Sequence, residues 1–184
     1  MRNETKKFST RKLTTVGMLC AFAYAAVVLG RVPVVLFLKY DPKDVIIVIG
    51  GLLFGPLEAF LIAGIVSVTE MLTISGTGIF GCVMNIISSV SFACTTAWIY
   101  QKKRRFSGVA SGLVCGVLCQ VTVMMLWNYL IAPLYMGYPR EEVVKLLWSA
   151  FLPFNLLKGT MNALLSLLLW RMMIKSPIKK MISR

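Results

Sequence analysis

The sequence contains no histidine, and only seven of its 184 residues are acidic. Ser-His hydrolases, His-ligated zinc sites and haem with a histidine axial ligand therefore each lack a necessary part. No Gly-Lys dipeptide occurs, so the GxxxxGKS or GxxxxGKT loop that holds nucleotide phosphates in ATPases is also absent. If this chain moves a solute uphill at the expense of ATP, a different subunit must hydrolyse the ATP.

Charged residues make up only 15% of the chain, whereas 58% of the residues are hydrophobic and the mean hydropathy is +0.78. Soluble domains carry about 25% charged residues, so this composition indicates a protein of the lipid bilayer. The net charge of +13 comes from basic residues that flank apolar stretches, which is typical of membrane topology signals. We therefore expect no nucleic acid partner and no enzymatic activity in this chain.

Six apolar stretches predict an all-α integral membrane protein with six transmembrane helices in a single membrane domain, residues 1–184. The expected helices are 13–30, 42–53, 57–73, 79–100, 107–131 and 144–173. The second stretch is short, because a bilayer crossing takes about 20 residues. Asp41 and Pro42 precede it, which predicts a helix start capped by the Asp41 side chain.

Basic clusters lie at residues 2–12, at 102–105 and near the C-terminus. Six crossings place all three clusters on one side of the membrane, and the positive-inside rule makes that side the cytoplasm. We therefore expect a multi-pass protein of the bacterial cell membrane with both termini in the cytoplasm.

The five cysteines are odd in number, and all of them lie within apolar stretches. Cysteine in such places commonly behaves as a small buried hydrophobic residue, and we expect this of all five. Cys115 and Cys119 share a helix face, but two thiols without further ligands are a weak signal for metal. The sequence therefore predicts no metal site.

Lys158 lies near the middle of the sixth apolar stretch, where a lysine costs about 2.5–3.5 kcal/mol to insert. On a helical wheel, Asn155, Lys158 and Asn162 fall within an arc of about 60°, with Trp148 on the same face. Two carboxamides and one cation suit a polar heteroaromatic ligand, so we favour a ligand pocket. The alternative is that Lys158 pairs with an interior acid such as Glu70 and only holds helices together.

Weaker candidates lie elsewhere in the chain. Asn128 is an amide near the outer end of the fifth helix, where it could bind a ligand or make an ordinary interhelical hydrogen bond. Asn85 lies in the fourth helix and is a less specific candidate. Tyr40 and Trp127 lie near the expected outer boundary, where aromatic residues usually form the interfacial belt.

Gly17, Ala21 and Ala25 recur at a four-residue spacing in the first helix. Small residues at this spacing form a smooth stripe that lets another helix approach closely. The stripe could pack within the chain's own bundle or dock onto a partner membrane protein.

Taken together, the segments resemble the S components of energy-coupling factor (ECF) vitamin transporters, and among them the riboflavin-specific members. The resemblance covers nearly the whole chain and includes the Phe54-Gly55-Pro56 break. Its most specific parts are the motifs NYLIAPLY at 128–135 and PFNLLKG at 153–159.

The resemblance implies that riboflavin or a close flavin is the transported ligand, that no separate cofactor is needed, and that Asn128, Asn155 and Lys158 bind the flavin. It also implies that Ala21 and Ala25 face the transmembrane coupling subunit EcfT, which is joined to two ATPase subunits. The family pattern further implies capture of the vitamin from outside and toppling of the S component to release it inside. We expect residues 31–41 to be a loop that acts as a lid over the ligand.

Two alternatives stay open at this point. The first keeps the fold and changes the ligand to another vitamin or a precursor. The second is a self-sufficient ion-coupled transporter of small molecules, in which Glu70 and Lys158 form a proton or ion relay.

Overall fold

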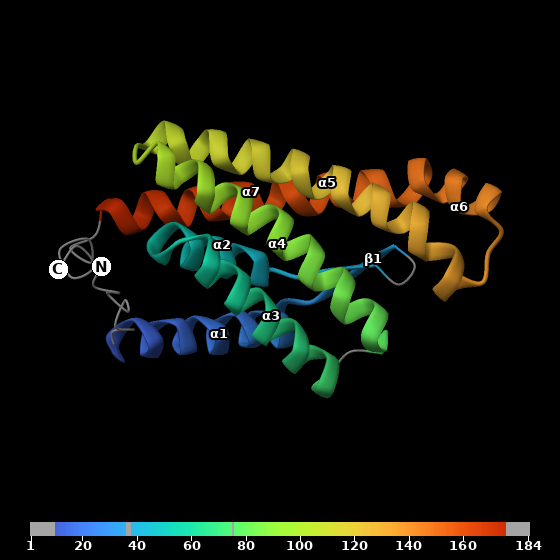
Figure 1. Cartoon of the computed structure of the whole chain (residues 1–184), viewed down its shortest axis with the longest axis horizontal. Helices are drawn as coiled ribbons and strands as arrows, with labels where there is room; N and C mark the ends of the chain where they lie inside the picture. The colour runs from blue at the N-terminus through green and yellow to red at the C-terminus, as the bar shows by residue number, and fades with distance from the viewer. Residues whose placement is uncertain (1–9, 36–37, 75, 176–184) are drawn as a thin grey trace, which may run out of the picture.

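The computed structural model describes residues 10–35, 38–74 and 76–175, so the basic residues expected at 1–9 and 176–184 lie outside the described residues. The elements are α1 (Thr10–Gly30), β1 (Val32–Val35), β2 (Leu38–Tyr40), α2 (Lys43–Phe54), α3 (Pro56–Thr73), α4 (Gly78–Lys102), α5 (Phe106–Met136), α6 (Arg140–Leu146), a π-helical turn η1 (Leu147–Phe151) and α7 (Leu152–Lys175). The long helices form one elongated bundle, with the start of α1 and the end of α7 at the same end (Figure 1).

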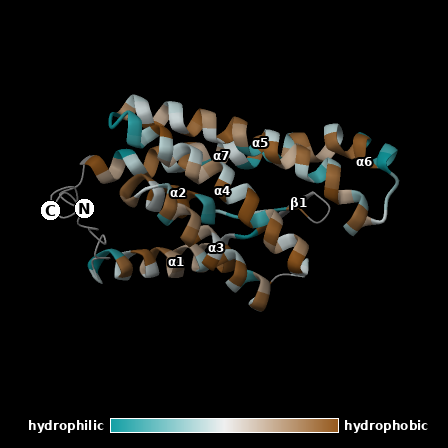
Figure 2. Cartoon of the chain, in the orientation of Figure 1, coloured by the Kyte–Doolittle hydropathy of each residue, from teal (hydrophilic) through white to brown (hydrophobic). Residues whose placement is uncertain are grey.

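Five helices are long and apolar enough to cross a membrane: α1, α3, α4, α5 and the segment Arg140–Ile174 that joins α6, η1 and α7. Large apolar side chains are exposed on these helices, and hydrophobic residues make up most of their length (Figure 2). In water such a surface would favour aggregation, whereas in a bilayer it contacts lipid. The chain is therefore an all-helical, multi-pass membrane protein.

The second helix, α2, has only 12 residues and is the most enclosed element of the bundle. It packs against α1, α3, α4 and α7. Its apolar side chains Ile47, Val48 and Leu52 belong to the main hydrophobic core. Because other helices surround α2, protein covers the charged residues of its first turn, Lys43 and Asp44.

Residues 31–41, which the sequence predicts as a loop, contain a two-stranded antiparallel sheet. The paired residues are Val32 with Tyr40, Pro33 with Lys39 and Val35 with Leu38. The β-branched valines of this segment favour an extended backbone, and proline is tolerated because both strands are edge strands. The hairpin folds back over the start of α2.

The expected cap of α2 by Asp41 is wrong. Pro42 occupies the cap position, and no side chain makes a capping hydrogen bond there. The Asp41 carboxylate instead pairs with the Arg31 guanidinium, with Oδ1 2.7 Å from Nε. An ion pair with a guanidinium is stronger than a single hydrogen bond to a backbone N–H, so Asp41 pairs with Arg31 at the end of α1 instead of capping α2.

The sixth predicted helix is interrupted by the π turn. The N–H of Leu152 bonds to the carbonyl of Leu147, five residues back, just before Pro153. Proline has no N–H and its ring clashes with the carbonyl four residues earlier, here that of Ser149, which explains the wider turn. The extra residue rotates the preceding chain, so Trp148 is 69% exposed and does not share the face of Asn155 as predicted.

The cysteines also differ from expectation. Cys82 is buried, Cys20, Cys94 and Cys119 are half-buried, and Cys115 is exposed. The prediction that all five are buried is therefore wrong. Cys115 lies on the outer face of α5, where a small apolar side chain is as well placed against lipid as in a core.

Candidate ligand-binding site

A cavity of about 270 Å³ lies where the hairpin, α4, α5 and α7 meet. Its polar and charged lining residues include Arg31, Lys39, Asp41, Asn85, Asn155 and Lys158. A second hollow of about 620 Å³ lies next to it and shares Gly76, Thr77 and Met84 with its lining. The second hollow adds apolar and aromatic walls from Phe80 and Tyr135. Together they offer a ligand one polar end and one apolar end, as small-molecule sites typically do.

Lys158 is only 5% exposed, and its charge is compensated by Asp44 at the start of α2. The Lys158 Nζ lies 3.2 Å from Asp44 Oδ2. Asp44 also accepts hydrogen bonds from the Ser89 hydroxyl and from Asn162 Nδ2, the latter at 3.2 Å. The Tyr40 hydroxyl donates to Asn162 Oδ1 at 2.9 Å, which ties β2 to the same group.

Glu70 belongs to a separate cluster and does not pair with Lys158. The fully buried Lys43 ammonium pairs with Glu70 Oε1. Arg31 Nη2 lies 2.6 Å from Glu70 Oε2. Asn85 Nδ2 donates weakly to Glu70 at 3.4 Å. Lys158 therefore pairs with an interior acid, as the alternative expects, but the acid is Asp44 and not Glu70, because α2 presents Asp44 to the lysine and Lys43 to the glutamate.

The two clusters are balanced in charge. Three cations, Arg31, Lys43 and Lys158, face three carboxylates, those of Asp41, Asp44 and Glu70. An unpaired charge in a low-dielectric interior is costly, so this balance is what permits six charged groups inside a membrane bundle. A ligand that enters next to them need not be charged.

Two groups near the hairpin have pKa values set by this environment. Burial disfavours the charged form of Arg31, but the hydrogen bond and charge of Asp41 and the pairing with Glu70 outweigh it and raise the Arg31 pKa. Burial and the nearby charge of Asp44 raise the pKa of Tyr40. Arg31 therefore stays charged, and the Tyr40 hydroxyl keeps the proton that it donates to Asn162.

Asn155 is positioned to face a ligand. Its Nδ2 donates to the carbonyl of Phe151 at 2.8 Å, in the π turn. Within the part of the chain that the structure describes, Asn155 Oδ1 has no hydrogen-bond partner, and the residue lines the cavity. A ligand N–H or O–H can therefore use this acceptor.

Asn128 is fully buried and lies behind the cavity wall. Its Nδ2 donates to the carbonyl of Met124 at 2.7 Å, and its Oδ1 accepts from the Tyr135 hydroxyl at 3.2 Å. Met124 lines the polar cavity and Tyr135 lines the apolar one. Asn128 therefore does not line either hollow itself. Its two hydrogen bonds hold the lining residues Met124 and Tyr135 in place.

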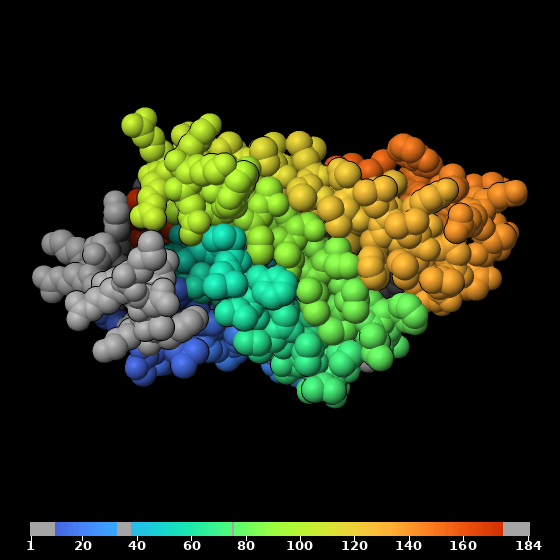
Figure 3. All heavy atoms as spheres, in the orientation of Figure 1, coloured from blue at the N-terminus to red at the C-terminus, as the bar shows by residue number. Residues whose placement is uncertain are grey.

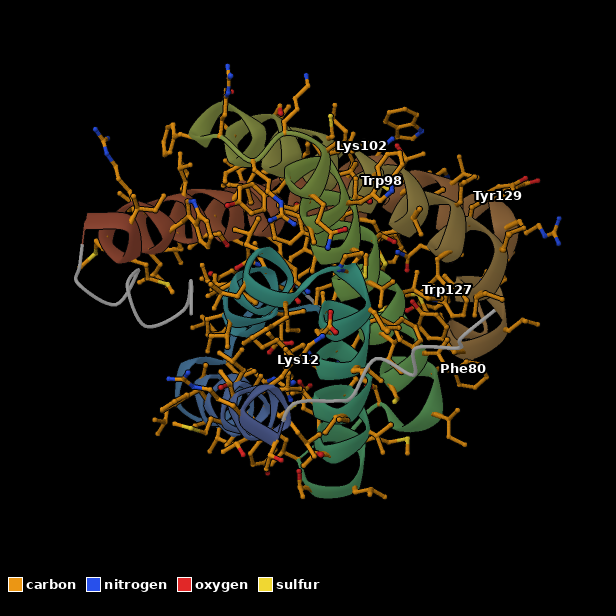
Figure 4. The ribbon with its side chains drawn as sticks, turned by 60° about the vertical axis from the view of Figure 1, so that its left-hand side comes forward. Lys12, Phe80, Trp98, Lys102, Trp127 and Tyr129 are labelled. Atoms are coloured by element: carbon orange, nitrogen blue, oxygen red, sulfur yellow. The ribbon has the colours of Figure 1, made fainter. Side chains whose placement is uncertain are left out.

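The weaker candidates divide in the same way. Asn85 lines the cavity. Asn162 and Tyr40 lie behind Lys158, bonded to one another. Trp127 is half-buried and lines neither hollow. Trp127 and Tyr129 both lie on α5 (Figure 4).

Sequence reasoning missed several residues that the fold brings to the cavity. Ser88 lines it, and its Oγ accepts a hydrogen bond from the fully buried Gln120 at 2.9 Å. Asp44 is a second, because the sequence places it near a predicted helix start and gives no sign of its partner Lys158. The signal for Ser88 was its three-residue spacing from Asn85, which places both on one helix face. Arg31 carried no signal, because its partner Glu70 is distant in the chain.

The hairpin forms one wall of the cavity through Leu38 and Lys39. Leu38 is buried and packs in a small apolar cluster with Ala132, Phe151 and Phe154. The hairpin is therefore held by apolar contacts on one side and by the Arg31 and Tyr40 bonds on the other.

The small-residue stripe lies on the outer surface. Gly17, Ala21 and Ala25 are all exposed on α1, and a Cβ added at Gly17 would meet no atom within 4 Å. The alternative that the stripe packs within the chain's own bundle is therefore wrong. The opposite face of α1, with Val16, Ala23 and further apolar residues, provides that packing instead.

The Glu70 cluster yields a test of stability. Glu70→Gln leaves the buried Lys43 without a carboxylate, and removal of one partner from a buried ion pair costs about 3–5 kcal/mol. We expect a clearly lower melting temperature in detergent. The matched control, Glu141→Gln, changes an exposed acid on α6 and should leave the melting temperature nearly unchanged. Equal melting temperatures for the two variants would contradict the role of Glu70.

The fold closely matches a solved structure described as "Structure and mechanism of the S component of a bacterial ECF transporter". The TM-score is 0.79 at 26% identity, covering 90% of this chain and 96% of that one. Two relatives align over most of their length. "Riboflavin transporter RibU" of Staphylococcus aureus (strain TCH60) is 25% identical, covering 92% of this chain and 94% of the relative. "Riboflavin transporter FmnP" of Bacillus subtilis (strain 168) is 28% identical, covering 81% and 84%.

Residues 11–170 match the family described as "ECF transporter, substrate-specific component", which is nearly the whole of the bundle. The chain accordingly belongs to the substrate-specific S components of ECF transporters.

Proposed function

We propose that this S component captures riboflavin or a close flavin from outside the cell and delivers it inward. The observation that carries the proposal is the two-part cavity, in which Lys158 and a free Asn155 acceptor lie at one end and aromatic walls at the other. A flavin has the same division, because its ring system is flat and largely apolar while one edge carries carbonyl and N–H groups. The two relatives named as riboflavin transporters support this choice of ligand.

Lys158 would donate to the polar edge of the flavin. An ammonium group has three N–H donors, and Asp44 occupies only part of this capacity. The Asn155 Oδ1 would accept from a ring N–H. A ligand without matching groups leaves these polar atoms unpaired in a closed site, and such mismatches are the strongest source of discrimination.

Asn128 has a different part in this proposal. Its Oδ1 is already bonded to the Tyr135 hydroxyl. Direct contact with the flavin, as the family resemblance implies, requires Tyr135 to turn away and release it. Tyr135 lines the apolar hollow, so an entering ring would be the group that displaces it.

Residues 31–41 would act as the lid. The hairpin already lines the cavity, and its outward movement requires breaking the Tyr40 to Asn162 bond and withdrawing Leu38 from its apolar cluster. Closure over the flavin would exclude water and strengthen each polar contact with the ligand.

Uphill transport would depend on partner subunits. We infer that the exposed stripe Gly17, Ala21 and Ala25 docks onto the transmembrane coupling subunit EcfT, with two ATPase subunits bound to EcfT on the cytoplasmic side. Both termini of this chain would lie in the cytoplasm. Toppling of the S component would then expose the cavity to the inside. The ion-coupled alternative loses its support, because Glu70 and Lys158 have separate partners.

The ligand can be tested directly on purified protein. The visible absorbance spectrum of the full chain in mild detergent should show flavin bands from co-purified ligand, and added riboflavin should lose fluorescence on binding. Colourless protein that also fails to quench riboflavin fluorescence would contradict riboflavin as the ligand, while the family assignment would stand and other vitamins would be titrated.

Lys158→Ala should weaken riboflavin binding at least about tenfold, which is about 1.4 kcal/mol, because the main donor to the polar edge is lost. Asp44 keeps Ser89 and Asn162 as donors, so the bundle should still fold. Lys145→Ala removes an exposed lysine from α6 and serves as the control. Fluorescence titration measures both. Unchanged affinity in a folded Lys158→Ala variant would exclude the lysine from the site.

Ala21→Leu should prevent docking without affecting the ligand. The larger side chain fills the smooth stripe, and helices that rely on small residues for close approach are separated by such a change. We expect loss of co-purification with the coupling subunits and unchanged riboflavin affinity. Cys115→Leu, on the exposed face of α5, is the matched control. If Ala21→Leu co-purifies with the coupling subunits as well as Cys115→Leu does, the stripe is not the docking face.

A further inference from the structure

A third hollow, of about 630 Å³, lies at the end of the bundle where α1 begins and α7 ends. It is formed where the ends of α2, α4 and α7 meet the turn between α4 and α5. Its lining includes Phe54, Tyr100, Gln101, Arg104, Arg105 and Trp170. None of its lining residues is shared with the flavin cavity, so it is a separate site.

The inner wall of this hollow is apolar and aromatic. Trp170 is buried and meets Tyr100 edge to face, with ring centroids 5.3 Å apart. Leu53 and Met173 complete this wall. This wall can make apolar contacts with a hydrocarbon chain, and it has very little with which to bind a fully hydrated ion.

The mouth of the hollow is positively charged. Arg104 and Arg105 are both exposed there. They belong to the turn between α4 and α5, a segment that Figure 3 shows in yellow-green at one end of the molecule. Across the described ranges, neither arginine has an ion-pair partner, and Glu58, which lies beside the lining residue Gly55, is buried and paired with Lys12. The two guanidinium groups are therefore available to an external anion.

Neighbouring side chains place the mouth at the level of the membrane surface. Lys102 Nζ lies 3.5 Å from the ring centroid of Trp98, and both residues lie on the outer side of α4 (Figure 4). Tryptophan and lysine at a helix end are typical of the interface between hydrocarbon and water. The hollow thus opens toward the lipid headgroups of that leaflet.

We propose that this hollow binds an anionic phospholipid, with the headgroup phosphate on Arg104 and Arg105 and an acyl chain against the aromatic wall. Arginine binds phosphate through two parallel N–H bonds, and basic pockets between transmembrane helices commonly hold anionic headgroups. A free phosphate would leave the apolar wall unused. A zwitterionic phospholipid carries the same phosphate, but its choline cation is repelled by the two arginines, so an anionic headgroup is preferred.

The test is native mass spectrometry of the full chain, extracted from an equimolar mixture of phosphatidylglycerol and phosphatidylcholine. We expect the wild-type chain to retain phosphatidylglycerol preferentially. In the double variant Arg104→Gln with Arg105→Gln, the ratio of retained phosphatidylglycerol to phosphatidylcholine should fall at least about tenfold. Each arginine near a membrane surface strengthens anionic lipid binding several-fold.

The control is Arg140→Gln with Lys145→Gln, which removes two exposed cations from α6 and changes the net charge equally. Retention by the two double variants at the same level would overturn the proposal, since the effect would then be one of net charge. Equal retention of both lipids by the wild-type chain would also overturn it.

Two further arms separate other anions and partners. Displacement of phosphatidylglycerol by millimolar inorganic phosphate would show a soluble phosphate site and overturn the lipid assignment. If the Arg104 and Arg105 variant keeps its lipid but no longer co-purifies with the coupling subunits, the hollow is a protein contact and the proposal fails. Unchanged melting temperature and riboflavin affinity would show that each variant is folded.

Discussion

The structure depends on the compensation of charge inside a membrane bundle. Lys43, Asp44 and Glu70 are fully buried and Lys158 nearly so, and each of them has an opposite charge as a direct partner. Without these partners the cost of insertion would fall on every helix that carries a charge. Because the partners come from α2, α3 and α7, the same contacts that neutralise the charges also fix how these helices pack.

The short α2 is the element that makes this arrangement possible. A helix that spans the bilayer must keep its polar ends near the two surfaces, whereas α2 is enclosed by other helices and begins inside the bundle. Its first turn therefore delivers Lys43 to α3 and Asp44 to α7. The hairpin before it returns the chain to Arg31, so that Asp41 pairs with Arg31, and residues 31–44 thus contribute to the ion pairs, the proposed lid and one wall of the cavity.

Hydropathy predicted the long helices because each is bounded by charged or turn residues, and helical periodicity placed Asn155, Lys158 and Asn162 together on a buried face. The prediction that Trp148 shares this face was wrong. A helical wheel assumes a constant pitch, whereas Pro153 forces a π turn between Trp148 and Asn155. The partners of Lys158 and Glu70 could not be read from the sequence, since several interior acids and cations were available. Only the packing of α2 selects among them.

The role of α1 follows from which residues it presents at its end and along its outer face. Arg31, directly after its last turn, lines the polar cavity and pairs with Asp41 and Glu70. Ala21 and Ala25 lie on the exposed stripe of the same helix. A helix with continuous backbone hydrogen bonds moves as a nearly rigid body, so a ligand that displaces Arg31 acts on the helix that carries the proposed docking face. The cavity and the proposed docking face are thus connected through one helix, which would link ligand occupancy to the proposed contact with the coupling subunit without a longer pathway through the bundle.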